Sequence, residues 1–183
     1  MTDVTQVRPP RARRLKIVAL VIVVVGIAVD LWSKSYMQER LGMSPDFQGS
    51  REHVEVIDGF FRFEGNWNTG VTFGIAQGWT EPILIFTVLA SVGLAAWLVL
   101  TRSQSRLLHV ALAMILAGAL GNLYDRFTWH KVRDFLLVYW KDPSVWQWPA
   151  FNVADSMIVV GVSFILGIEL FGHRTPKPAG PPA

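Results

Sequence analysis

The sequence predicts a membrane all-α protein with four transmembrane helices and one or two short strands in the first outer loop. Hydrophobic residues make up 51% of the 183-residue chain and charged residues only 17%, whereas soluble domains contain about 25% charged residues. The mean hydropathy is +0.35. The apolar residues are concentrated in four runs without period-two alternation, so helices rather than a β-barrel are expected to cross the bilayer.

The second apolar run shows most clearly that these segments are long enough to span a membrane. It contains twenty residues without a charge, and at about 1.5 Å rise per residue such a helix matches the roughly 30 Å hydrocarbon core of a bilayer. The expected spans are about 15–32, 82–101, 107–124 and 156–172. They form a single membrane domain, 1–174, with outer loops at 33–81 and 125–155 and a Pro-rich, disordered cytoplasmic tail at 175–183.

The first span follows the basic stretch RARRLK, as the apolar core of a secretory signal peptide also does. Gly26 and Ala28 could serve as the small residues of a cleavage site. A retained membrane anchor is the simpler expectation, because three further spans follow it.

Basic residues predict the orientation of the bundle. Nine of the 17 Lys and Arg residues lie before the first span, between the second and third, or after the fourth. Both termini are therefore expected in the cytoplasm and the two long loops outside, as in a multi-pass membrane protein. Seven of the eight Trp residues lie in or beside these loops, where an interfacial aromatic belt is expected. The N-terminal basic cluster is explained by topology, so no nucleic-acid partner is expected.

The first outer loop carries Val, Ile and Phe in partial alternation over 54–63. This pattern predicts one or two short strands, with a turn at Gly59, lying on the membrane surface.

Polar and ionisable residues gather at the span ends that this topology places outside, where such groups are costly and often functional. The groups are Asp30 with Lys34; Asn66, Asn68, Thr69 and Gly70; Gly118, Gly121, Asn122, Asp125 and Arg126; Asp134; and Asn152 with Asp155.

Each group alone has an ordinary structural explanation. Asp30 and Lys34 could be a helix-end ion pair, and Asn68–Gly70 a turn. Glycines in the third span could permit close helix packing, and Asn152 or Asp155 could cap a helix. Together, however, they place an unusual number of carboxylates and amides at one membrane edge.

The residue inventory narrows the possible chemistry. The chain has no Cys, its four His residues show no metal-ligand spacing, and no nucleotide-binding or nucleophile motif is present, so no metal and no cofactor are expected. Two aspartates held close together can share one proton and hydrolyse a peptide bond without a cofactor. Spacing alone does not show which aspartates form the pair.

Five motifs resemble, in order, those of the lipoprotein signal peptidase (signal peptidase II) family: DLWSK, NTGVTFG, GALGNLYDR, VRDF and WPAFNVADSMIVVG. They cover about residues 30–161. Val71 and Thr72 stand where the family usually has small residues, and Ala117 where it usually has Gly; these departures leave the polar groups in place.

The resemblance implies a membrane-embedded aspartic endopeptidase of the bacterial plasma (inner) membrane, active at its outer (periplasmic) face. It would remove signal peptides from diacylglyceryl-modified prolipoproteins by cutting before the lipidated Cys. The strands of the first outer loop would form a small extracytoplasmic β-cradle for substrate, and the cyclic peptide globomycin would be an inhibitor. Membrane lipids are further partners, and a monomer would suffice.

The resemblance also assigns roles by motif. Asp134 and Asp155 would be catalytic, and Asp125 structural. Substrate-binding positions would be Asn68, Asn122, Arg126 and Asn152, and the site would be supported by Asp30, Lys34 and Gly70.

Three other functions compete with this interpretation. A proton-translocating carrier would place ionisable groups near mid-span, whereas here they lie at span ends. A non-catalytic assembly factor or inactive relative would not need both Asp134 and Asp155. A different intramembrane aspartic protease is disfavoured because no GxGD string is present.

Overall fold

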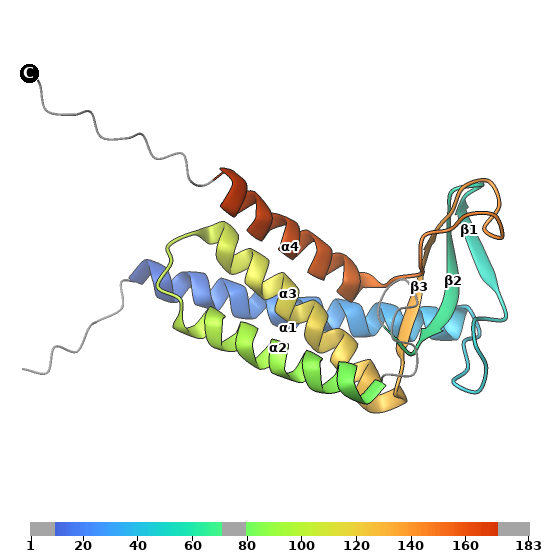
Figure 1. Cartoon of the computed structure of the whole chain (residues 1–183), viewed down its shortest axis with the longest axis horizontal. Helices are drawn as coiled ribbons and strands as arrows, with labels where there is room; N and C mark the ends of the chain where they lie inside the picture. The colour runs from blue at the N-terminus through green and yellow to red at the C-terminus, as the bar shows by residue number, and fades with distance from the viewer. Residues whose placement is uncertain (1–9, 71–79, 172–183) are drawn as a thin grey trace, which may run out of the picture.

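The computed structural model describes residues 10–70 and 80–171. Four long helices run side by side, and a three-stranded sheet covers one end of them (Figure 1). The element order is α1 (Pro10–Arg40), β1 (His53–Ile57), β2 (Phe61–Asn68), α2 (Thr80–Leu100), α3 (Arg106–Trp129), β3 (Val132–Val138) and α4 (Val153–Phe171). Within the described residues, these four helices are long and apolar enough to cross a membrane, which confirms the expected fold class of four membrane-spanning helices.

α3 is the central helix, because it packs against each of the other three. Small side chains permit this packing: Ala113 and Ala117 are completely buried, together with Leu112. The outward faces of the other helices carry exposed apolar side chains such as Val24, Phe86 and Leu166, as expected for surfaces in contact with lipid.

Two helices extend beyond their expected ends. α1 continues to Arg40 and α3 to Trp129, although polar residues begin near 33 and 125. Hydropathy marks where a helix leaves the hydrocarbon and carries no information about where its backbone stops being helical. These extensions carry both helices out to the sheet.

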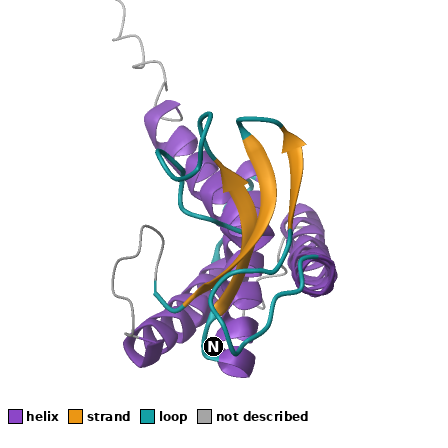
Figure 2. Ribbon diagram, turned by 90° about the vertical axis from the view of Figure 1, so that its right-hand side faces the viewer, coloured by secondary structure: helices purple, strands orange, loops and turns teal. Residues whose placement is uncertain are grey.

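The sheet is antiparallel with strand order β1-β2-β3 and lies across the ends of the helices (Figure 2). β1 and β2 form the expected hairpin, whose turn contains Gly59 at φ 70°. β3 comes from the second outer loop, where the sequence analysis placed no strand. Its sequence, VRDFLLV, does not alternate between apolar and polar residues. The first four residues are all buried, so neither face of this part of the strand is exposed to solvent.

A hydrophobic cluster between the sheet and the end of α1 holds the sheet on the bundle. Trp67 of β2 and Phe135 of β3 are almost completely buried against Leu41 and Met43, which follow α1. Burying large aromatic and aliphatic side chains stabilises this contact by about 1.5–3 kcal/mol each. The position of β3, and hence of Asp134, is therefore fixed by packing.

Candidate active site

Asp134 and Asp155 come from different elements and meet at the sheet end of the bundle. Asp134 lies in β3 and is 1% exposed, and Asp155 lies in the first turn of α4. Asn152 contacts both: its side-chain Nδ2 donates to Asp134 Oδ1 at 2.7 Å, and its backbone N–H donates to Asp155 Oδ2 at 3.1 Å. One residue thus holds the two carboxyl groups next to each other.

The same residue caps α4. Asn152 precedes the first residue of the helix, and its Oδ1 accepts the backbone N–H of Asp155 at 2.9 Å. Together with the bond from Asn152 N–H to Asp155, this forms the reciprocal pattern of a capping box, here built from Asn and Asp. The carboxyl group of Asp155 lies at the positive end of the helix dipole, which favours negative charge there.

The chain before α4 explains why Asn152 reaches Asp134. The backbone of Phe151 pairs with Leu136 of β3, accepting from its N–H at 2.8 Å and donating to its carbonyl at 3.0 Å. The segment therefore runs along the edge of β3 and places the following residue, which is completely buried, beside Asp134.

Two further amides complete the hydrogen bonding of the carboxyl groups. Asn68 Nδ2 donates to Asp134 Oδ2 at 2.9 Å, and Asn122 Nδ2 donates to Asp155 Oδ1 at 2.7 Å. All four carboxyl oxygens of the pair consequently accept a hydrogen bond from an amide. Such fixed donors orient the two groups and limit their rotation.

Burial raises the pKa of Asp134 well above its usual value, and the neighbouring carboxyl of Asp155 raises it further. Its hydrogen bonds from Asn68 and Asn152 and the charge of Lys34 act in the opposite direction but are smaller. Two close carboxyl groups in a low dielectric cannot both ionise cheaply. The arrangement therefore suits a pair that shares one proton.

A buried ion-pair cluster lies beneath the pair. Lys34 Nζ is 2.8 Å from Asp30 Oδ2 and 3.6 Å from Asp125 Oδ2, and all three side chains are completely buried. Lys34 also donates to Asn122 Oδ1 at 2.9 Å, and Asp30 Oδ1 accepts the backbone N–H of Ala154 at 2.9 Å. The cluster thus joins α1 to α3 and to the first turn of α4.

Arg133 is a residue that the sequence analysis missed. Its guanidinium binds both carboxyl oxygens of Asp125, at 2.5 and 3.2 Å, and it also donates to Gln38 Oε1 at 3.0 Å. Asp125 therefore pairs with Arg133 and Lys34 rather than with its neighbour Arg126. The only sequence signal for the role of Arg133 is its position inside the VRDF motif, next to Asp134. A buried arginine requires a buried partner, but the sequence alone does not show that Arg133 is buried.

Arg126 and Gly70 lie together at the edge of the site. Arg126 donates to the carbonyl of Gly70 at 3.2 Å, and the backbone N–H of Gly70 donates to Asn68 Oδ1 at 2.9 Å. The remainder of the NTGVTFG motif lies outside the described residues, as do Arg8, Arg174, Lys177 and the tail 175–183. Within residues 10–70 and 80–171, no three His, Cys, Asp or Glu residues are grouped closely enough to hold a metal ion.

Comparisons with known proteins identify the family to which this chain belongs. The family model described as "Signal peptidase (SPase) II" matches residues 22–171. The lipoprotein signal peptidase of Clostridium novyi is 35% identical over 142 residues, covering 78% of this chain and 90% of that protein. The lipoprotein signal peptidase of Ectopseudomonas mendocina is 37% identical over 156 residues, covering 83% of this chain and 86% of that protein.

Solved structures show the same arrangement of elements. A bacterial membrane enzyme determined by the in meso method at 2.3 Å resolution superimposes with a TM-score of 0.74 and 26% identity, over 90% of this chain and 94% of that one. A second, at 1.9 Å resolution, gives a TM-score of 0.67 and 25% identity, over 86% and 94% of the two chains. The chain belongs to the signal peptidase II family of membrane-embedded aspartic peptidases, the lipoprotein signal peptidases.

Proposed function

We propose that this chain removes signal peptides from prolipoproteins by cutting before a Cys that carries diacylglycerol, with Asp134 and Asp155 as the catalytic pair. The observation that carries the proposal is the double role of Asn152, which binds both carboxyl groups at one end of a four-helix membrane domain. Family membership supports the substrate class.

The pair works with one proton, which we place on Asp134 because burial raises its pKa. The Asp155 carboxylate takes a proton from a water molecule, whose oxygen bonds to the scissile carbonyl carbon while Asp134 protonates the carbonyl oxygen. Asp155 then gives its proton to the leaving nitrogen as the C–N bond breaks, and the diol returns a proton to Asp134. The products are a carboxylic acid and an amine, and the pair again holds one proton.

The amides around the pair position it for this reaction. Asn68, Asn122 and Asn152 hold the carboxyl oxygens in place, and Arg126 and Gly70 form the adjoining edge where a substrate backbone can bind. Asp30 and Lys34 support the site from below by fixing the first turn of α4.

A lipid-anchored substrate explains why the site lies at a span end. Each buried CH₂ holds a lipid in the membrane by about 0.8 kcal/mol, so the scissile bond stays near the interface, at a depth that water reaches. The sheet over this end would act as the cradle for the peptide (Figure 2).

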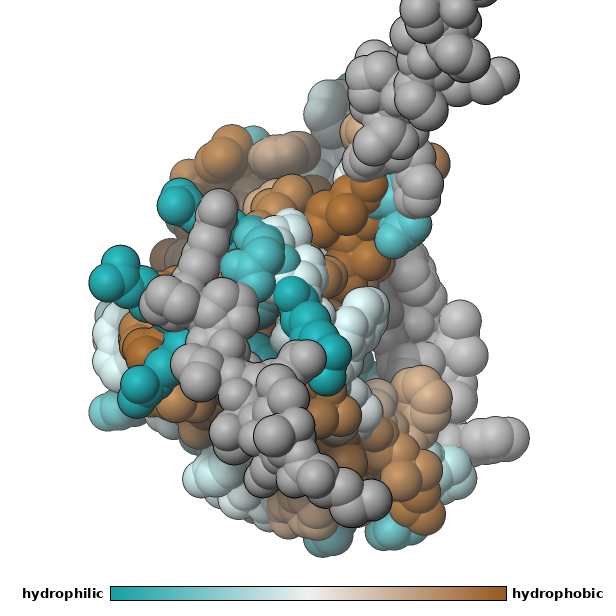
Figure 3. All heavy atoms as spheres, turned by 90° about the vertical axis from the view of Figure 1, so that its left-hand side faces the viewer, coloured by the Kyte–Doolittle hydropathy of each residue, from teal (hydrophilic) through white to brown (hydrophobic). Residues whose placement is uncertain are grey.

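The proposal includes the orientation of the chain in the membrane. Figure 3 views the end of the bundle that carries the α2–α3 connection, where hydrophilic side chains lie beside apolar ones. Arg13 and Arg14 lie near the start of α1, and Arg102 and Arg106 lie in or beside the α2–α3 connection. The positive-inside rule places this end in the cytoplasm and the catalytic pair at the outer face. A monomer would suffice because both aspartates lie in one chain, and globomycin would inhibit by occupying the same site.

The proposal is tested by cleavage of a diacylglyceryl-modified prolipoprotein by the purified protein in lipid. Wild type should cut before the lipidated Cys, and globomycin should block the reaction. The variants Asp134→Asn and Asp155→Asn should each lose activity by about 10³-fold, as expected for removal of an acid–base group.

The matched control is Asp58→Asn, which removes an exposed carboxylate from the β1–β2 turn and should leave cleavage unchanged. Thermal melting of each variant separates lost chemistry from lost folding. Full activity in either active-site variant, or equal cleavage of the same precursor without its lipid, would contradict the proposal.

A further inference from the structure

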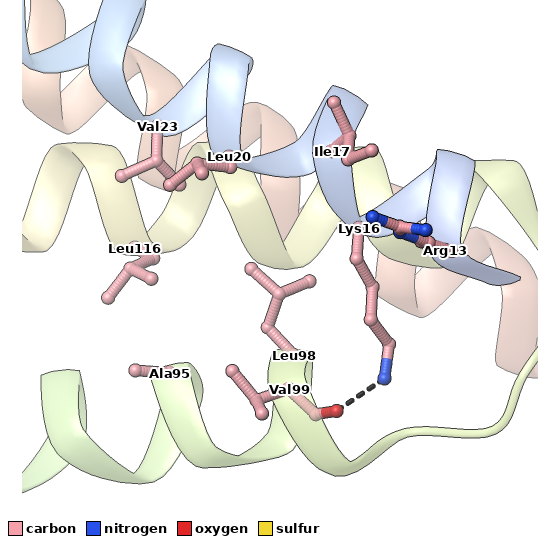
Figure 4. A pocket seen from close by; sticks show the side chains of 9 residues that line it. All are labelled: Arg13, Lys16, Ile17, Leu20, Val23, Ala95, Leu98, Val99 and Leu116. Atoms are coloured by element: carbon pink, nitrogen blue, oxygen red, sulfur yellow. Dashed lines mark hydrogen bonds between the residues drawn. The ribbon is translucent and has the colours of Figure 1, made fainter. Parts of the chain in front are cut away.

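A groove lies between α1 and α2 at the end of the bundle opposite the catalytic pair (Figure 4). It encloses about 720 Å³, which is within the range of small-molecule sites. Leu20 of α1 and Ala95 and Leu98 of α2 form its sides, and Leu116 of α3 lies at its floor. The groove exists because α1 and α2 each pack on α3 and little on each other.

Two cations close one end of this groove. Arg13 and Lys16, one helical turn apart on α1, are its charged lining residues, and every other residue that lines it is apolar. Lys16 also donates a hydrogen bond to the carbonyl of Val99, near the end of α2 (Figure 4). The groove thus combines a cationic end with an apolar channel.

This combination matches an anionic phospholipid. Basic pockets between transmembrane helices bind acidic headgroups, because each Lys or Arg near the membrane surface attracts an anion. The apolar walls below the two cations would accommodate an acyl chain running along the bilayer normal, whereas a free phosphate ion would gain nothing from them.

Charge also argues against the two other occupants that such a groove could take. A signal-peptide helix carries a positively charged n-region, which Arg13 and Lys16 would repel. A second copy of this chain would bring its own Arg13 and Lys16 to a two-fold interface, with the same repulsion.

We propose that the groove between α1 and α2 binds one anionic phospholipid, with its phosphate at Arg13 and Lys16 and an acyl chain along Leu20, Ala95 and Leu98. The site is separate from the proposed catalytic pair, so it stands or falls independently of the peptidase mechanism.

Native mass spectrometry of the delipidated protein in mild detergent, titrated with dioleoylphosphatidylglycerol, measures the first binding event. Affinity should fall about thirtyfold in the double variant Arg13→Gln/Lys16→Gln, which corresponds to about 2 kcal/mol for two cations. Dioleoylphosphatidylcholine should bind wild type more weakly, and inorganic phosphate should not compete.

Two matched controls separate a site from general charge and from general lipid contact. Arg14→Gln/Arg106→Gln removes two cations from the same end that lie outside this groove and line a second one of about 790 Å³ between α1 and α3, and should retain most of the affinity. Ala95→Phe should fill the channel and abolish the first binding event, whereas Ala96→Phe, on the neighbouring exposed position, should not. Equal losses in the two charge variants, or equal binding of both lipids, would overturn the proposal.

The occupant in a membrane is identified by a photo-crosslinking residue in place of Leu20, which lines the groove and is 62% exposed. The proposal requires an adduct with the mass of an anionic phospholipid. Adducts with prolipoprotein or with a second copy of the chain would refute it. Peptidase activity measured in parallel reports separately on the catalytic proposal.

Discussion

At the scale of single residues, the site depends on how its charges are compensated. Asp134 is buried with only amide donors in hydrogen-bond contact, so ionising it is costly and its pKa is raised. Catalytic groups are commonly destabilising in this way, because the environment that tunes them does not suit their charged form. Lys34, by contrast, has carboxylate and amide partners on α1 and α3.

The raised pKa of Asp134 predicts a pH-dependent stability. The folded state holds this proton more tightly than the unfolded state, whose aspartate pKa is about 3.9, so stability falls as pH rises from that value through the folded pKa. In Asp134→Asn this loss is absent. The melting temperature of Asp134→Asn relative to wild type should therefore be higher at pH 8 than at pH 4.5, and Asp58→Asn should show no such trend. A difference that shrinks with pH would contradict the assignment.

The ion-pair cluster predicts a large effect of Lys34. Lys34→Met leaves Asp30 without its cationic partner in a buried site and should cost about 3–5 kcal/mol of stability. Arg40→Met is the matched control on the same helix, because its pair with Glu52 is exposed on both sides and such pairs contribute at most about 1 kcal/mol.

Thermal or denaturant unfolding in detergent measures both of these variants. The double variant Asp30→Asn/Lys34→Met should recover part of the lost stability, since it removes the orphaned charge. A Lys34→Met protein as stable as Arg40→Met would show that the cluster does not hold the helices together.

At the scale of elements, α3 and α4 determine where the proposed catalytic pair can lie. A side chain at Gly118 of α3 would collide with the carbonyl of Ala154, in the first turn of α4, and a Cβ there would come within 2.8 Å of Ile158. Because Gly118 has no side chain, α4 can begin directly against α3, which places Asp155 within reach of Asn122.

Gly118→Ala should consequently push the start of α4 away from α3. We expect about 1–3 kcal/mol of lost stability, as for other overpacked contacts, and reduced cleavage because Asp155 moves with the helix. Gly93→Ala on α2 is the control, since nothing lies within 4 Å of a Cβ there, and it should be neutral or slightly stabilising. Unchanged melting and cleavage in Gly118→Ala would rule out this account of the packing.

At the scale of the whole molecule, the two ends of the bundle differ in kind. One end carries the sheet, the proposed catalytic pair and its supporting ion pairs (Figure 1). The other end carries the α2–α3 connection together with Arg13, Arg14, Arg102 and Arg106. By the positive-inside rule, this asymmetry supports the proposed orientation in the membrane.

The proposed topology is directly testable because the chain contains no Cys. A single Cys at Ser144, in the exposed segment after β3, should react with a membrane-impermeant maleimide in intact spheroplasts. A single Cys at Gln104, in the exposed α2–α3 connection, should react only after the membrane is permeabilised. The reverse pattern would invert the orientation and place the proposed catalytic pair on the cytoplasmic side.

The sequence by itself determined the four spans, the β1–β2 hairpin and the placement of polar residues at span ends. Each of these follows from local properties: hydropathy over about twenty residues, alternation over a few residues, and the position of a charge relative to a span. The five motifs indicated the family, and with it the two candidate aspartates.

Only the tertiary structure decided how those residues are held. It added β3 to the sheet, extended α1 and α3 beyond the apolar runs, paired Arg133 with Asp125, and made Asn152 the common partner of Asp134 and Asp155. Some of these contacts join segments that are distant in the chain. Others depend on which face of a helix or strand a residue occupies. Their stability comes from burial and mutual charge compensation, which are properties of the packed molecule and leave no local pattern in the sequence.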